Sequence, residues 1–198
     1  MIPHCDELFF RFFDRWYTLD AKSSKPYKAT RPDMEKLGSL IRAKISDVQP
    51  LTIEGQQKTQ KQLTAMFKAA REDWPGYLSL SGEPSLEWIE AFDRHYDCVK
   101  IAGVIERSDP EDLGNDYVVI CCELGAFLGE LFLRERKDLQ WLYEVPYWEP
   151  AIMDCSAGWR INVFHWAIKK MSDYAVDDGL AGKLQAAMRT LTEHEGVR

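Results

Sequence analysis

The stretch 116-DYVVICCELGAFLGELFLRER-136 is apolar around most of its circumference when it is read as a helix. At 100° per residue, most of its charged side chains fall within about 40° of one another, because seven residues are close to two turns. These side chains are Asp116, Glu123, Glu130 and Arg134. A helix with only one narrow polar stripe belongs inside a domain. We therefore predict a buried central helix over Asp116–Arg136.

Two glycines interrupt the apolar surface of this helix. Gly125 and Gly129 lie four residues apart and therefore face the same side. Each glycine costs roughly 1 kcal/mol of helix propensity relative to alanine. A glycine pair of this spacing lets a neighbouring element approach closely, so we expect a packing contact at this position.

The polar stripe has two interpretations, and the sequence leaves both open. In the first, Glu123 and Glu130 form the solvated edge of the helix, and Glu130 pairs with Arg134 one turn later. In the second, the two carboxylates line a cleft with Arg160 and His165 and bind a cation or act as an acid and a base. The carboxylates lie roughly 10 Å apart along the axis, which is too far for them to chelate one ion alone.

The chain before the central helix is predicted to be helical. Phenylalanines and Trp16 suggest an aromatic helix over Asp6–Leu19, although its apolar residues cover more than one helix face. A basic connector, Ala21–Pro32, follows it. Apolar residues then recur at three- and four-residue spacing. This recurrence predicts helices over Asp33–Ser46, Gln56–Asp73 and Pro84–Glu106.

Punctuating residues define the ends of these helices. We expect Trp74-Pro-Gly to stop the second of them and Ser85 to cap the third. Pro110 lies near the expected start of the central helix, with Ser108 or Asp109 as its cap.

The character of the sequence changes after Lys137. Three short segments rich in aromatic and β-branched residues predict an antiparallel meander over Leu139–Val145, Pro150–Asp154 and Trp159–Val163. A helix capped by Asn162 and a last helix through about Leu191 follow. We predict one α+β domain over residues 1–198, predominantly helical, with a small three-stranded antiparallel sheet in its C-terminal half. Its parts are residues 1–32, 33–136 and 137–198.

Charge and composition limit the classes of function. The chain is 45% hydrophobic and carries a formal net charge of −7, with residues 1–60 slightly basic and the remainder strongly acidic. An acidic body repels phosphate backbones, so we expect no nucleic-acid partner. No apolar stretch reaches the roughly 20 residues that span a bilayer, so no membrane association is expected. Five cysteines without disulfide spacing indicate reduced thiols and a cytoplasmic location.

Motifs for catalysis or cofactor binding are weak. The chain contains no phosphate-binding loop, dinucleotide fingerprint, GxSxG or HExxH. His95-x-x-Cys98 has the spacing of two metal ligands, but no second pair completes a zinc site. We therefore predict no metal and no cofactor. Tyr147 and Trp148 lie between two prolines and are candidates for exposed aromatic anchors of a partner.

The C-terminal half resembles a pattern found in bacterial α+β proteins of unknown function. The pattern covers about residues 114–185 and consists of Glu123-Leu-Gly-Ala-Phe-Leu-Gly-Glu130, Trp141, Pro150, Gly158, Asn162-Val-Phe164 and Lys169-Lys-Met171. Such proteins are similar to small immunity proteins of bacterial toxin systems. Val163 stands where that pattern often has proline. The resemblance implies an α+β fold, and it transfers no activity and no site residue.

The leading hypothesis is a binding protein of immunity or regulatory type. It would bind a protein partner through its acidic and aromatic surface, for which the candidate residues are Glu123, Glu130, Tyr147, Trp148, Arg160 and His165. The alternative is a small-ligand binder or an enzyme with a cleft between the central helix and the sheet. A homodimer through the aromatic N-terminal helix is a further expectation.

Overall fold

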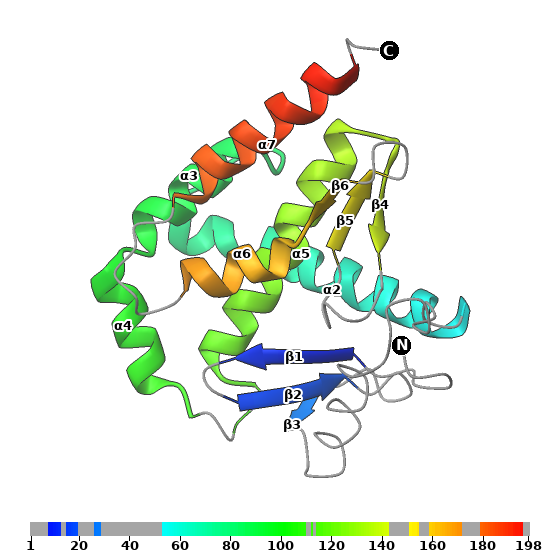
Figure 1. Cartoon of the computed structure of the whole chain (residues 1–198). Helices are drawn as coiled ribbons and strands as arrows, with labels where there is room; N and C mark the ends of the chain where they lie inside the picture. Colours follow the sequence, from blue (N-terminus) through cyan, green and yellow to red (C-terminus); the bar gives the residue numbers. More distant parts are fainter. Residues whose placement is uncertain are drawn as a thin grey trace.

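The central helix lies in the middle of the molecule, as predicted (Figure 1). The computed structural model describes residues 8–12, 15–19, 26–28, 53–109, 112, 114–142, 151–154, 159–171 and 179–195. Helix α5 spans Asp116–Glu135, and Asn115 caps it by accepting a hydrogen bond from the Val118 N–H. Twelve of the twenty residues of α5 are buried, so it is the main element against which the other elements pack.

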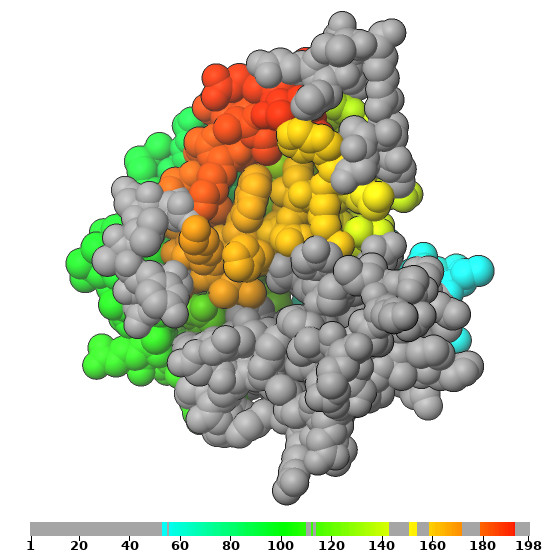
Figure 2. Space-filling model, in the orientation of Figure 1, coloured from blue at the N-terminus to red at the C-terminus, as the bar shows by residue number. Residues whose placement is uncertain are grey.

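Five other described helices surround α5. They are α2 (Ile53–Leu78), α3 (Leu86–His95), α4 (Cys98–Arg107), α6 (Val163–Lys170) and α7 (Leu180–Glu195). Helices α2 and α6 make the most extensive contacts with α5, and α7 packs mainly on α3. Helices α6 and α7, in orange and red, both reach the surface on the face shown in Figure 2. The largest fully buried side chains come from α2, α3 and α5, which places the core between these helices.

The antiparallel meander of the C-terminal half is confirmed. Strands β4 (Leu139–Leu142), β5 (Ala151–Asp154) and β6 (Trp159–Ile161) pair in the order β4-β5-β6. The register sets Trp141 opposite Ile152, and Ile152 opposite Ile161. These three side chains are buried, so one face of the sheet joins the core. The fold class is therefore α+β.

The glycine pair of α5 has the packing role that its spacing indicates. A Cβ atom on Gly125 would lie 2.5 Å from the ring of Phe164 in α6. A Cβ atom on Gly129 would overlap the ring of Trp141 in β4. Two aromatic rings thus contact the backbone of α5 directly, which fixes both α6 and the sheet against the central helix.

The prediction of an aromatic N-terminal helix is wrong, because these residues form strands. Strand β1 (Leu8–Phe12) pairs antiparallel with β2 (Arg15–Leu19), and β3 (Pro26–Lys28), inside the expected connector, pairs with β2. Phenylalanine, tryptophan and tyrosine favour strands, and only two residues separate β1 from β2, the shortest common hairpin connection. The expected homodimer required an N-terminal helix as its interface, and these residues form strands instead. The expected helix over Asp33–Ser46 lies outside the described residues.

Two of the predicted helices before α5 also differ from the structure. Helix α2 continues through Pro75 to Leu78, and it keeps Trp74 fully buried. Burial of a large aromatic side chain offsets much of the roughly 3 kcal/mol that an interior proline costs. The expected single helix over Pro84–Glu106 is two helices, because Asp97 caps α4 through the Lys100 N–H.

Two residues, Asn115 and Ser108, accept hydrogen bonds from the first turn of α5. Asn115 is the N-cap residue, whereas Ser108 or Asp109 was expected there. Ser108 nevertheless accepts a hydrogen bond from the Tyr117 N–H, so its hydroxyl serves the first turn of α5. Similarly, Asn162 stands at the N-cap position of α6, but its side chain accepts a hydrogen bond from Arg160 Nε.

Candidate functional site

Glu123 is buried between α5 and α2. Its side chain is 8% exposed, and its Oε2 accepts a hydrogen bond from Trp74 Nε1 at 3.0 Å. Burial raises the pKa of this carboxyl group above its usual value, and the Trp74 hydrogen bond partly opposes that rise. Helix α2 supplies Trp74 because it continues past its expected stop. Glu123 is therefore a core carboxyl group and not part of a solvated edge.

The raised pKa of Glu123 predicts a pH-dependent stability. The folded state binds more protons than the unfolded chain once the pH exceeds the ordinary pKa near 4.5. Glu123 therefore stabilises the fold fully below that pH, and this contribution is lost as the pH rises through the folded-state pKa. We expect the stability of Glu123→Gln relative to the wild type to increase as the pH rises above about 4.5, and urea unfolding at several pH values measures this change. A difference that does not change with pH would contradict this assignment.

Glu130 and Arg134, which were expected to pair with each other, contact different neighbours. Glu130 is half-buried, and its Oε1 accepts a hydrogen bond from Trp141 Nε1 at 3.5 Å. The Arg134 guanidinium lies 4.9 Å from the ring centre of Phe67 and 3.9 Å from Glu83. Glu123 and Glu130 therefore face different elements, since Glu123 faces α2 and Glu130 faces β4.

The remaining sequence-derived candidates are spread over the fold. Arg160 lies in β6, where it donates to Asn162 Oδ1 at 3.0 Å. His165 is exposed on α6. Tyr147 and Trp148 lie outside the described residues. The four described candidates thus have separate surroundings, and none of them lines the cleft between α3, α5 and α7 that is described below.

Another group of polar side chains lies where α3 ends and α4 begins. Tyr77 and Tyr96 share a hydrogen bond, and burial is the main cause that raises the pKa of both. His95 Nδ1 lies 3.3 Å from Lys100 Nζ, while burial and the Lys100 charge lower the pKa of His95. Cys98 is exposed beside them. No described group of three His, Cys, Asp or Glu residues is arranged to hold a metal ion.

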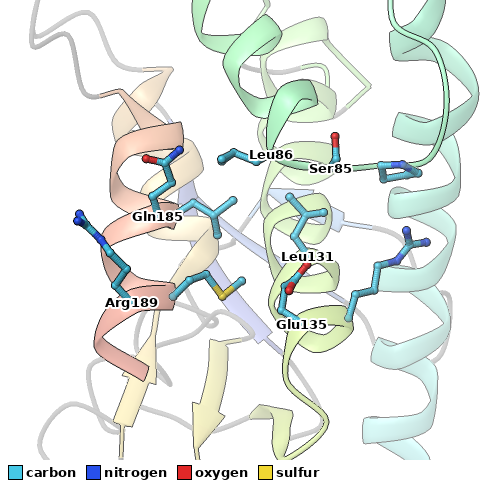
Figure 3. A pocket seen from close by; sticks show the side chains of 10 residues that line it. Ser85, Leu86, Leu131, Glu135, Gln185 and Arg189 are labelled. Carbon is cyan, nitrogen blue, oxygen red and sulfur yellow. The ribbon is translucent and has the colours of Figure 1, made fainter. Parts of the chain in front are cut away.

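An open cleft lies between α3, α5 and α7, and its volume is about 460 Å³. Apolar side chains from all three helices line it, accompanied by polar residues. The described residues of the lining are Pro84, Ser85, Leu86, Leu131, Arg134, Glu135, Leu184, Gln185, Met188 and Arg189. Figure 3 shows Leu86 extending from α3 toward α7, with Leu131 on the facing surface of α5. The cleft is thus an apolar concavity with a polar rim.

Helix α7 forms one wall of this cleft because it is held near both ends. Near its start, the Ala181 N–H donates to Asp93 Oδ2 at 2.9 Å, and Asp93 Oδ1 lies 3.4 Å from the buried ammonium group of Lys170. Near its end, Arg136 Nη1 donates to the Leu191 carbonyl at 2.8 Å. The segment between these anchors carries Leu184 and Met188 into the cleft lining.

The sequence identifies the lining residues only as ordinary helix residues. Ser85 stands at the N-cap position of α3, as predicted, but its side chain makes no capping hydrogen bond. Leu131 belongs to the apolar surface of the central helix, and Leu184 and Met188 lie in the expected last helix. A cleft formed by three helices depends on their relative placement, and no local pattern encodes that placement.

No protein-family model, no curated protein and no solved structure matches this chain. The resemblance to immunity-type proteins therefore rests on the quoted residues of the C-terminal half. Among the described residues, no helix combines the length and the hydropathy needed to cross a membrane.

Proposed function

We propose that this chain is a binding protein that holds a small molecule in the cleft between α3, α5 and α7. The observation that carries the proposal is the cleft itself, with its volume of about 460 Å³ and its mainly apolar lining. Ligand pockets commonly have volumes of about 300–1,000 Å³, apolar walls and a few polar groups. This is the small-ligand alternative derived from the sequence, placed beside α7 and not beside the sheet.

The walls of the cleft suit a binding role because two of them belong to well-anchored helices. Helix α5 is fixed by the ring contacts at Gly125 and Gly129, and α7 by its hydrogen bonds to Asp93 and Arg136. A preformed site loses less conformational entropy when it binds a ligand than a site that must first be assembled.

A protein partner at the acidic surface stays a prediction from the sequence, as does the immunity-type role. Large exposed apolar side chains, such as Val99 on α4 and Ile53 on α2, lie on separate helices. Single exposed apolar residues are common on protein surfaces, so they do not strengthen that hypothesis.

Titration with N-phenyl-1-naphthylamine, a neutral dye that fluoresces in apolar surroundings, tests the proposal. We expect saturable binding to one site per chain. Met188→Trp places a large ring in the cleft lining and is expected to weaken binding at least about tenfold, since overpacking is costly. Ala186→Trp adds the same ring at an exposed position of α7 and should leave the affinity unchanged. Absence of saturable binding, or equal loss in both variants, would overturn the proposal.

A further inference from the structure

We infer that the ligand of this cleft is a neutral, largely apolar molecule of about the size of two or three aromatic rings. The inference rests on the proposed function and names the class of ligand. Four of the ten lining residues are leucine or methionine and a fifth is proline, and they come from the loop before α3 and from all three helices. A molecule in the cleft therefore contacts mainly aliphatic surface, with polar residues around it.

The charged residues of the lining do not provide an interior counter-charge for an anion. The guanidinium group of Arg134 is engaged outside the cleft, over the ring of Phe67 and 3.9 Å from Glu83. Arg189 extends on the side of α7 that faces away from Leu86 and Leu131 (Figure 3). Both cations thus lie at the margin of the cleft and not within it.

The lining also offers little to a cation. Among the described lining residues Glu135 is the only carboxylate, and it is exposed near the end of α5. An exposed carboxylate is well solvated, so its attraction for a bound cation is weak. A ligand that carried a charge into the apolar part of the cleft would lose hydration without gaining a buried partner. Because the charged residues of the lining lie at its margin, we expect the cleft to bind neutral apolar ligands more tightly than charged ones.

The volume of the cleft limits the size of the ligand. A cavity of about 150 Å³ lined by aliphatic side chains is sufficient for benzene. The present cleft is about 460 Å³, roughly three times larger. Met188 adds adaptability, because an unbranched thioether side chain fits ligands of varied shape.

Two dyes that share one ring system test the inference. N-phenyl-1-naphthylamine is neutral, whereas 8-anilino-1-naphthalenesulfonate carries a sulfonate on the same framework. We expect the neutral dye to bind at least about tenfold more tightly, because the sulfonate would lose hydration without a buried partner. We also expect 1-decanol to displace the neutral dye at lower concentration than either decanoate or decyltrimethylammonium. Met188→Trp should weaken the binding of the neutral dye, which assigns it to this cleft.

The outcomes separate this inference from the proposed function. If neither dye binds saturably, the proposed function fails and the inference fails with it. If the sulfonated dye binds as tightly as the neutral one and Met188→Trp weakens both, the cleft is a binding site but the inference is wrong. Displacement by decyltrimethylammonium before 1-decanol would likewise overturn the inference and would indicate a cationic ligand.

Discussion

Asp93→Asn is expected to lower the free energy of unfolding by about 3 kcal/mol or more. Asp93 lies 3.4 Å from the ammonium group of Lys170, whose side chain is only 3% exposed. Asparagine has the same shape and its side-chain oxygen can still accept the Ala181 N–H bond. The variant therefore removes the charge partner of Lys170 and leaves an ammonium group buried without compensation. Urea unfolding at neutral pH measures the loss.

A double variant separates the charge effect from a packing defect. Lys170→Met removes the buried charge, and Asp93→Asn then has no ammonium group to strand. We expect the double variant to regain most of the stability that Asp93→Asn loses, since apolar replacements of buried ion pairs are often neutral or stabilising. If the two substitutions add without coupling, the ion pair does not hold α3, α6 and α7 together as described.

Gly129→Ala is expected to cost about 3 kcal/mol of folding free energy, at the upper end for overpacked cores. The new methyl group would occupy space that the Trp141 ring fills, and this ring packs between α5 and the sheet. Either β4 moves away from α5 or the ring adopts a strained rotamer. Thermal and urea unfolding measure the cost, and Gly125→Ala, which meets Phe164, should behave similarly.

Gly182→Ala is the matched control. Gly182 lies in α7, is exposed, and has nothing within 4 Å of a Cβ atom built on it. Alanine there should stabilise the protein by about 1 kcal/mol or less, because alanine has the higher helix propensity. Equal effects at Gly129 and Gly182 would show that the Trp141 contact does not constrain the central helix.

The sequence predicts the parts of the fold that local periodicity determines. The narrow polar stripe of α5 and its glycine spacing predict burial and close approach, and both are observed. Alternating aromatic and β-branched residues also predict the meander of β4, β5 and β6. In these segments, local preference and tertiary packing favour the same structure.

Tertiary packing explains most of the differences. Burial of Trp74 carries α2 through a proline that should end a helix, and that extension gives Glu123 its hydrogen-bond donor. In the N-terminal segment, the apolar residues do not fit one helix face. This misfit agrees with the strands that the structure shows there. The cleft was not predictable from the sequence, because its apolar lining residues show the same helical spacing as residues of the buried core.

Methyl NMR on leucine- and methionine-labelled protein locates bound N-phenyl-1-naphthylamine and so tests whether the cleft is the ligand site. We expect the methyl signals of Leu86, Leu131, Leu184 and Met188 to shift together with one saturation curve. Leu63, buried in α2 and absent from the cleft lining, should stay unchanged. Saturable binding that shifts other methyl groups and leaves those of the cleft unchanged would contradict the proposed site.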